Sequence, residues 1–430
     1  MTPEVKERIE QLRHGIVPEG YQKTILGIAP LSWKTGRINE ICTLSSGSTP
    51  RRDNADNFVG DILWVTSGEL KKRIIIDTLE KISEAAASTS NMTMYEPGAV
   101  VIAIYGLEAA GIRGTASIIG KRCTISQACM AFTEFSKVDN IFFYYWYLKN
   151  GQIIGLRYAQ GTKQQNLSTD IVGAFPICFP NLVEQRKIAE ILTTQDKVIE
   201  LKEQLLAEKQ RQKKYLMQQL LTGKKRLPGF DGEWKNCRLR QIVNHIRSRN
   251  TVGNKNVLTI SAQYGLINQS DFFNKEIASE DKSNYYLLHR NDFAYNKSYS
   301  SGYPFGAIKR LTRHDLGIVS PLYICFRIVE GDVSMDYMEQ YFEAGLMNCE
   351  IQAFAQEGAR NHGLLNISAD DFFNSKIVLP SYEEQQSIAA TLSATDREIE
   401  LLNQNLEQEK QKKKALMQLL LTGIVRVKGE

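Results

Sequence analysis

The sequence lacks the features of a disulfide-framed or membrane-spanning protein. Its seven cysteines are an odd number and include no Cys-x-x-Cys pair, which argues against a disulfide framework and favours a reducing compartment. The longest apolar runs, such as Ala99–Leu107, are far shorter than the roughly 20 residues that cross a bilayer. The first residues carry no signal-peptide pattern. We therefore expect a cytoplasmic protein with no membrane contact.

The motifs of common enzyme chemistries are missing as well. The sequence has no Gly-x-x-x-x-Gly-Lys-Ser/Thr loop, no Gly-x-Gly-x-x-Gly and no Asn-Pro-Pro-Tyr type tetrad such as adenine methyltransferases use. Its five histidines are scattered without metal-ligand spacing. Asp271, Glu280 and Lys282 imitate the triad of a metal-dependent nuclease, although charged loops often produce such triplets. We expect a binding protein without catalytic residues, metal or cofactor of its own, and keep a nuclease as an alternative.

What the chain does contain is an internal duplication. Glu184–Gly223 and Glu384–Gly423 align without a gap, and 20 of the 40 aligned positions are identical. Each stretch lacks Pro and Gly before its last residue and repeats its apolar residues at intervals of three and four. This pattern predicts a long helix that stops at a glycine. With a rise of 1.5 Å per residue, each helix would be ~57 Å long.

One heptad row is shared by the two predicted helices and could form a coiled-coil seam. Its apolar members are Leu192, Ile199, Leu206 and Leu220 in the first helix and Leu392, Ile399, Leu406 and Leu420 in the second. Only about ten residues separate the first helix from the next globular unit, and the second helix begins where that unit ends. We therefore predict that the second helix runs back beside the first. The antiparallel pair would relate the two halves by an approximate two-fold axis.

The chain length of 430 residues suits two domains of about 150 residues plus the helices, and the net charge of +5 is compatible with a nucleic-acid partner. The predicted fold class is α+β, with two globular domains separated by the antiparallel pair of long helices. The expected segments are a short N-terminal helix and lead-in (1–32), a first globular domain (33–180), the first long helix (181–223), a linker (224–233), a second globular domain (234–380), the second long helix (381–423) and a tail (424–430).

Three smaller patterns refine this division. Strands are expected at Ile62–Val65 and Val100–Ile104. The aromatic block Phe142–Tyr147 is predicted to be a packed helix, with stacking on nucleic-acid bases as the alternative. Ile9–Val17 resembles Met417–Val425, so we expect the two chain ends to pack near one another, unless the likeness over nine residues is a coincidence.

The two globular domains share their edges but not their loops. Trp33 corresponds to Trp234, and the Asn166 pentapeptide NLSTD corresponds to NISAD at Asn366. The loop tips between these edges differ and carry side chains that can bind phosphates and base edges, although solvated surface is the default for any such loop. The candidate DNA-binding residues are Arg51, Arg52, Lys71, Lys72, Arg73, Lys163, Gln164 and Gln165 in the first domain and Arg247, Arg249, Lys297, Tyr299, Tyr303, Arg360, Asn361 and His362 in the second. Most of the cations should bind phosphate.

Both predicted helices also carry a basic run near their C-terminal parts, at Lys209–Lys214 and Lys410–Lys414. Positive charge suits this end of a helix dipole. We expect solvated surface here, with docking of partner subunits or contact with DNA as the alternatives.

Several stretches resemble the DNA-specificity subunits of type I restriction-modification enzymes, and the resemblance covers nearly the whole chain. They are LPSYEEQQSIA at Leu379–Ala389, YNKSYSSGYPFGAIKRL at Tyr295–Leu311, SSGSTP at Ser45–Pro50, DILWVTSGEL at Asp61–Leu70 and the Leu-Leu-Thr-Gly helix endings. The resemblance implies two target recognition domains that each read one part of a split, asymmetric sequence in double-stranded DNA.

The resemblance also implies partners. A subunit of this family is non-catalytic and holds two methyltransferase subunits, which supply S-adenosylmethionine chemistry, while ATP- and Mg-dependent restriction subunits join the complex. The helices would set the unread gap, since ~57 Å spans at most about 17 base pairs. A coiled-coil scaffold that binds no nucleic acid remains a further alternative.

Overall fold

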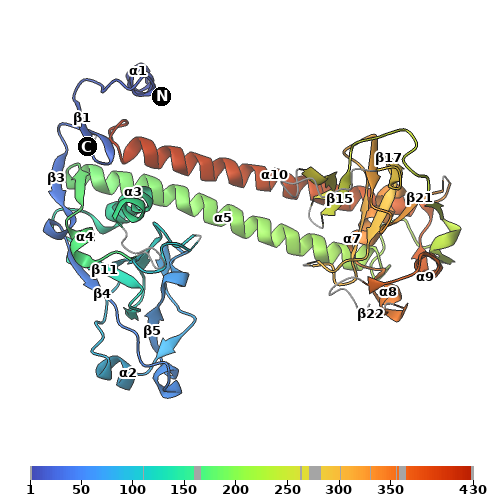
Figure 1. Ribbon diagram of the computed structural model, residues 1–430, viewed down its shortest axis with the longest axis horizontal. Coiled ribbons are helices and arrows are strands. Elements are labelled where there is room, and N and C mark those ends of the chain that lie inside the picture. The colour runs from blue at the N-terminus through green and yellow to red at the C-terminus, as the bar shows by residue number, and fades with distance from the viewer. Residues whose placement is uncertain are drawn as a thin grey trace. The chain divides into compact units, whose positions relative to one another are not determined.

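The computed structural model describes residues 2–109, 111–158, 166–261, 264–270, 282–300, 302–329, 331–354, 356–357 and 365–427. The chain divides into two compact units. The first consists of Met1–Lys202 and Asn405–Glu430, and the second of Glu203–Gln404. Each long helix contributes one half to either unit, because α5 (Leu182–Leu220) and α10 (Tyr382–Leu420) both cross the boundary between them (Figure 1).

The first unit is built on a five-stranded sheet with the order β4-β11-β8-β9-β6 and a three-stranded sheet with the order β10-β5-β7. Their strands are β4 (Thr43–Ser46), β5 (Ile62–Val65), β6 (Ile74–Ile75), β7 (Lys81–Ile82), β8 (Val100–Ala103), β9 (Ala116–Ile119), β10 (Cys123–Ile125) and β11 (Cys129–Thr133). The pairs β6–β9 and β5–β10 are parallel, and the other neighbours are antiparallel. Both strands predicted from the sequence are confirmed, as β5 and β8.

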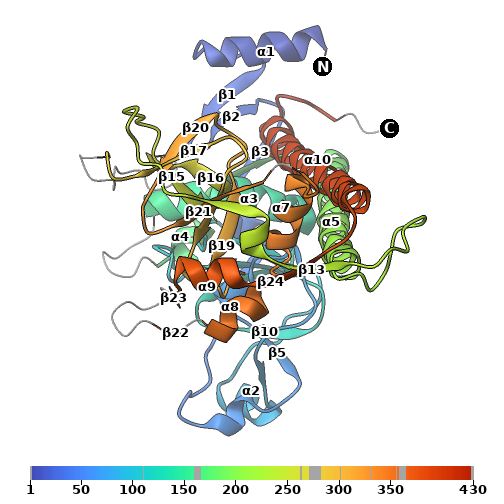
Figure 2. The same ribbon diagram turned by 90° about the vertical axis from the view of Figure 1, so that its right-hand side faces the viewer.

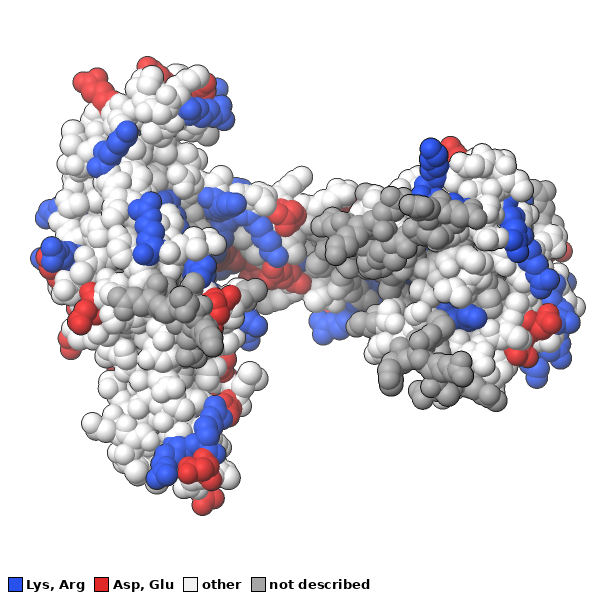
Figure 3. Space-filling view, viewed as in Figure 1, with Lys and Arg blue, Asp and Glu red and all other residues white. Residues whose placement is uncertain are grey.

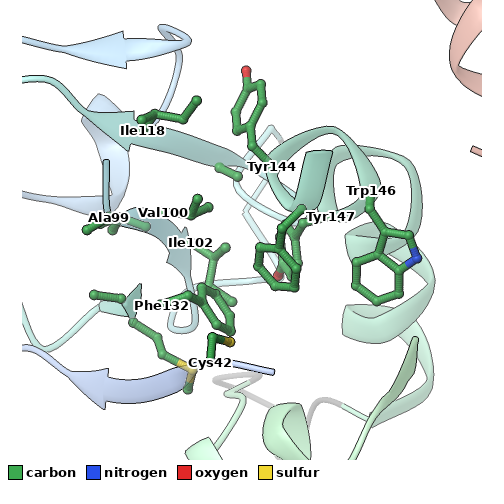
Figure 4. Close-up of a cluster of buried hydrophobic side chains, with 14 of the residues drawn as sticks. Cys42, Ala99, Val100, Ile102, Ile118, Phe132, Tyr144, Trp146 and Tyr147 are labelled. Carbon is green, nitrogen blue, oxygen red and sulfur yellow. The ribbon is translucent and has the colours of Figure 1, made fainter. Parts of the chain in front are cut away.

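Helix α3 (Asn140–Tyr158) packs on the five-stranded sheet and contains the aromatic block. Every side chain from Phe142 to Tyr147 is at most 4% exposed. Tyr147 points toward Ile102 of the sheet, whereas Trp146 lies on the side of the helix that faces away from the sheet (Figure 4). The predicted packed helix is therefore confirmed. The base-stacking alternative is wrong, because a buried ring has no free face to offer a base.

Short elements complete the first unit. The remaining helices are α1 (Pro3–Arg13), α2 (Glu84–Thr89) and α4 (Thr169–Gly173), and the two remaining antiparallel strand pairs are β1 (Tyr21–Thr24) with β2 (Gly27–Pro30) and β3 (Lys34–Arg37) with β12 (Pro176–Phe179). The chain ends meet within this unit. Tyr21 donates its hydroxyl hydrogen bond to the carbonyl of Gly423 at 2.7 Å, and Arg8 donates to the carbonyl of Ile424 at 3.2 Å. The prediction that the ends pack near one another is confirmed.

The second unit is built around a four-stranded antiparallel sheet with the order β14-β21-β18-β19, which repeats the order and the antiparallel pairings of β4-β11-β8-β9 in the first unit. Its strands are β13 (Lys235–Arg238), β14 (Val243–Ile246), β15 (Leu258–Ser261), β16 (Gly265–Asn268), β17 (Tyr286–His289), β18 (Phe293–Asn296), β19 (Ala307–Arg310), β20 (Leu316–Val319), β21 (Ile324–Ile328), β22 (Gln356–Glu357), β23 (Leu365–Asn366) and β24 (Lys376–Leu379). Its helices are α7 (Met335–Glu343), α8 (Asn348–Phe354) and α9 (Ala369–Asn374). Figure 2 shows this unit facing the viewer.

The two units also share a frame. The antiparallel pair β3–β12 of the first unit corresponds to β13–β24 of the second. Ser168 caps α4 by accepting a backbone hydrogen bond, and Ser368, 200 positions later, caps α9 in the same way. Gln185 and Gln385 both accept a backbone N–H at the start of the domain helix that packs beside them, at 2.7 and 2.9 Å. The predicted internal symmetry is confirmed at these positions.

The long helices are antiparallel in both units, as predicted. In the first unit, Gln195 of α5 donates to the Glu409 carboxylate of α10 at 2.8 Å. In the second unit, Lys213 of α5 pairs with Asp396 of α10 at 2.5 Å. Residue numbers therefore rise along α5 where they fall along α10, and Figures 1 and 2 both show the two helices side by side.

Both helices stop at the glycines that the sequence marks. Gly223 and Gly423 have φ angles of 68° and 67°, which side chains of L-residues rarely adopt. A Cβ atom at Gly423 would also lie 2.5 Å from Pro30 and 2.9 Å from Trp33. Glycine is required here for the reversal of the chain and for its close approach to the first domain.

Candidate nucleic-acid interface

One of the predicted loops of the first unit is held against the residues just before β7. Arg52 of one loop forms a bidentate ion pair with Glu80, at 2.5 and 2.9 Å. Its guanidinium also lies over the rings of Phe58 and Trp64, 4.4 and 5.0 Å from their centroids. The hydrogen bonds from Arg52 lower the pKa of the Glu80 carboxyl. Arg52 is thus committed to holding the loops together, whereas the neighbouring Arg51 is exposed and makes a single 3.4 Å contact with Asp53.

The next loop places three cations on the surface of the same unit. Lys71 and Lys72 are exposed and Arg73 is half-buried, and within the described residues no carboxylate forms an ion pair with any of the three. Figure 3 shows Lys and Arg side chains, mixed with acids, at the end of the unit that carries α2. Unpaired, exposed ammonium groups are suited to phosphate, so these lysines stay strong candidates.

In the second unit, Arg247 and Arg249 follow β14 and are both exposed. Arg247 donates to Nδ1 of His245 at 3.1 Å, and Arg249 donates to the side-chain oxygen of Asn284. Burial, and then the charge of Arg247, lower the pKa of His245, so the imidazole accepts this hydrogen bond in its neutral form. Each arginine keeps further N–H donors for a ligand.

The loop after β18 carries three candidate residues, which differ in exposure and in contacts. Tyr299 is 64% exposed and offers its ring and hydroxyl to solvent. Lys297 is half-buried and donates to the carbonyl of Ile367 at 3.4 Å, and burial lowers its pKa. The hydroxyl of Tyr303 contacts the Glu343 carboxylate and the ammonium of Lys309, at 3.0 Å for the latter. Tyr303 is therefore engaged within the domain, and of the three only Tyr299 presents a free side chain.

Six candidate residues lie outside the described residues. They are Lys163, Gln164, Gln165, Arg360, Asn361 and His362. Asp271 and Glu280 of the nuclease-like triplet also lie outside them. Among the residues that the structure describes, no group of three or more His, Cys, Asp or Glu side chains is placed to hold a metal ion. No helix in the described part of the chain has the length and apolarity to cross a membrane.

The predicted heptad row lies on the sheltered side of both long helices. Leu192, Leu220, Leu392, Leu406 and Leu420 are at most 7% exposed, and Ile199, Leu206 and Ile399 are half-buried. In the first unit, Leu192 and Leu420 belong to one apolar core that also contains the five-stranded sheet. In the second unit, Leu392 and Leu220 share a core with the four-stranded sheet. Each half of the helix pair is therefore part of the core of a globular domain.

Two of the lysines expected to be solvated surface instead form symmetric ion pairs between the helices. Lys413 pairs with Asp196 at 2.6 Å in the first unit, and Lys213 pairs with Asp396 at 2.5 Å in the second. Each aspartate also accepts a hydrogen bond from a helix of the adjoining globular domain. Asp196 accepts from Tyr145 of α3 at 2.7 Å, and Asp396 accepts from Gln340 of α7 at 2.9 Å. The prediction of solvated surface is wrong at Lys213 and Lys413, because carboxylates of the opposite helix reach them.

A second symmetric pair of contacts was missed in the sequence. Glu184, 4% exposed, accepts two hydrogen bonds of 2.8 Å from Arg426 in the first unit. Glu384, 1% exposed, accepts bonds of 2.6 and 2.7 Å from Arg226 in the second. These helix-end ion pairs join the start of one long helix to the residues just after the other. The 200-residue offset between Arg226 and Arg426 was the available signal, but both residues lie beyond the aligned repeat.

Comparisons with known proteins converge on one family. Residues 30–210 match the type I restriction modification DNA specificity domain. The chain is 25% identical over 339 residues to the type I restriction enzyme MjaVIII specificity subunit of Methanocaldococcus jannaschii, which covers 72% of this chain and 76% of the relative. The MjaIX specificity subunit of the same organism is 25% identical over 186 residues, 42% of either chain.

Solved structures show the same fold. The S subunit of a type I restriction-modification system from M. genitalium is 13% identical, with a TM-score of 0.51 over 92% of this chain and 96% of that one. A chain from a structure concerned with complex assembly and conformational transition of the type I R-M system is 16% identical, with a TM-score of 0.54 over 92% and 99% of the two chains.

Proposed function

Because this chain belongs to the type I restriction-modification DNA specificity subunits, we propose that it reads a split, asymmetric target in double-stranded DNA. Each recognition domain would read one half of the target. The first unit offers Arg51, Lys71 and Lys72 for this purpose, and the second offers Arg247, Arg249 and Tyr299. The chain itself would be non-catalytic.

The observation that carries this proposal is a repeated frame to which different strands and loops have been added. The helix-end ion pairs Arg426–Glu184 and Arg226–Glu384 join the two long helices in the same way in both units, and Asp196 and Asp396 each accept a hydrogen bond from a helix of the adjoining domain. The central sheets of the two domains share four strands in the same order, but the described strands around them differ: β6 and the sheet β10-β5-β7 in the first unit, and the pairs β15–β16 and β17–β20 in the second. A scaffold that bound two identical partners through its domains would have no use for this difference, whereas the reader of an asymmetric sequence requires it.

The long helices support two further parts of the proposal. Each is an uninterrupted helix of 39 residues, and we propose that their length sets the unread gap between the half targets. Leu201 and Leu401 occupy equivalent positions in the duplication and are each 64% exposed. Two equivalent apolar positions suit the docking of two copies of one partner, so we assign this surface to two methyltransferase subunits.

The chemistry then belongs to the partner subunits. We propose that S-adenosylmethionine is bound by the methyltransferase subunits, and ATP and Mg by restriction subunits that join through the complex. This chain would work on chromosomal DNA in the cytoplasm.

Mapping of methylated adenines tests the proposal. Cells that express this chain with its methyltransferase partner should carry methylation at one bipartite motif with unlike halves and a fixed gap. Cells that express the methyltransferase alone should lack it. A motif that is continuous or palindromic, or that persists without this chain, would refute the assignment.

A further inference from the structure

One large apolar side chain of the first unit is almost fully exposed to solvent. Leu79, which follows β6, is 93% exposed, more than any other large apolar side chain among the described residues. Burial of a leucine side chain is favourable, so this side chain forgoes a stabilising contribution. A single exposed leucine is ordinary on a protein surface, so its significance depends on how its backbone is held.

The backbone of Leu79 is fixed on both sides and at its own amide. Its N–H donates to one carboxylate oxygen of Glu69 at 2.7 Å, and the other oxygen of that carboxylate accepts from the backbone of Thr66, also at 2.7 Å. Thr78 is 8% exposed, and its hydroxyl donates to the carbonyl of Glu80 at 2.7 Å while accepting from the N–H of Trp64 at 3.3 Å. The loop therefore holds the Leu79 side chain outward and cannot readily fold it in.

The acids of the loop that carries Leu79 are engaged within the domain. Glu80 is neutralised by Arg52, and Asp77 pairs with Lys81 at 3.1 Å. The Glu69 carboxylate is occupied by backbone and hydroxyl donors. The loop's acids are thus satisfied internally, while the exposed Lys71 is joined to the same frame by its amide, which donates to the carbonyl of Glu69 at 2.7 Å.

We propose that Leu79 contacts the 5-methyl group of a thymine in the major groove and so specifies one base of the half target read by the first unit. This inference rests on the proposed function. Leu79 has no hydrogen-bonding group, and among the base edges of the major groove only thymine presents a methyl group to it. Lys71 and Lys72 supply the phosphate contacts that hold the loop against the duplex.

Replacing thymine by deoxyuridine removes this methyl group alone. Once the target is mapped, binding of the full chain with its methyltransferase partner is measured on duplexes in which each thymine of the half target is replaced in turn. At one position, the duplex with deoxyuridine should bind wild-type protein about fourfold more weakly than the unmodified duplex, because one buried methyl group is lost. L79S should bind the two duplexes equally, with the lower affinity, and should keep the thermal stability of wild-type protein because the side chain is exposed.

Two variants serve as controls. Leu322→Ser removes a 66% exposed leucine of the second unit and should keep wild-type sensitivity to deoxyuridine in the first half target. Lys72→Gln should weaken binding to both duplexes equally. It should also reduce by about 1 the slope of the logarithm of the binding constant against the logarithm of the salt concentration. Wild-type protein that ignores every replacement, or an L79S variant that still distinguishes thymine from deoxyuridine, overturns the assignment of Leu79. Absence of any split target would instead overturn the proposed function, and this assignment with it.

Discussion

Charged residues at a few positions fasten the long helices to the recognition domains. Glu184 is almost fully buried and receives both hydrogen bonds of Arg426, and it also accepts the backbone N–H of Val427 at 3.3 Å. Arg426 donates a third hydrogen bond to the hydroxyl of Ser32 at 3.0 Å. The residues after α10 are thereby attached both to α5 and to the lead-in of the first domain.

Removal of Arg426 should therefore destabilise the first unit. Breaking a buried ion pair costs about 3–5 kcal/mol because one charge is left unpaired. The Arg426 side chain is 38% exposed, so for Arg426→Ala we expect a loss of about 2 kcal/mol in the free energy of unfolding. Chemical denaturation measures it. Arg13→Ala, which breaks an exposed pair with Glu10, is the control and should cost at most about 0.5 kcal/mol. Equal effects of the two substitutions would contradict this role for Arg426.

The hydrogen bonds of Glu409 lead us to predict that the stability of the folded protein depends on pH. Hydrogen bonds from Lys202 and then Gln195 lower the pKa of this carboxyl from 4.5 to about 2. A carboxyl with a lowered pKa in the folded state stabilises the protein above its unfolded pKa, and this stability is lost as the pH falls toward the folded pKa. The stability difference between wild-type protein and Glu409→Gln should thus shrink between pH 4.5 and pH 2, as measured by thermal unfolding across that range. A difference that grows with acidity would show that Glu409 is not held as a carboxylate.

At the scale of single residues, the candidate DNA-binding site could be predicted from the sequence only in part. The sequence identifies loops rich in cations, and Lys71 and Lys72 are indeed exposed. It does not reveal that Arg52 is bound to Glu80 or that Tyr303 contacts Glu343, because these partners lie 28 and 40 residues away along the chain. A side chain that bonds to a distant part of the chain is no longer free to bind DNA. The composition of the surrounding sequence does not reveal such a bond.

At the scale of elements, the long helices are the most predictable part of the molecule. Their periodicity, their terminal glycines and their antiparallel direction all follow from the repeat and from the connection between its copies. The sheets of the recognition domains were not predictable in this way. Several of their strands, such as β6 and β7, have only two residues, and many are buried throughout, so neither length nor alternation distinguishes them from loops.

A longer helix pair should widen the unread gap. Four residues inserted after Gln204 and four after Gln404 would keep the two helices matched, and each insertion adds ~6 Å. With a rise of ~3.4 Å per base pair, the gap should grow by one or two base pairs. The methylated motif measures this directly. Four residues inserted after Gly232, in the exposed linker before β13, are the control and should leave the gap as it is. An unchanged gap after the helix insertions would rule out the spacing role of the helices.

At the scale of the whole molecule, one chain contains two copies of a unit that consists of a globular domain and a long helix. The duplication keeps the contacts that attach a domain to the helices and varies the domain that is attached. The Lys213–Asp396 and Lys413–Asp196 pairs and the shared four-strand order show what is kept, and the described strands around that shared sheet show what is varied. Because the contacts that join the helices are repeated while the strands and loops differ, we expect that one globular domain can change without disturbing the other half.

Exchange of one recognition domain tests this separation most directly. Residues 33–180 are replaced by the corresponding segment of a related specificity subunit with a different target, and methylated adenines are mapped in cells that also express the methyltransferase partner. We expect one half of the motif to change to that of the donor, while the other half and the length of the gap remain those of this chain. A motif in which both halves change, or neither does, would contradict the claim that each domain specifies one half of the target independently.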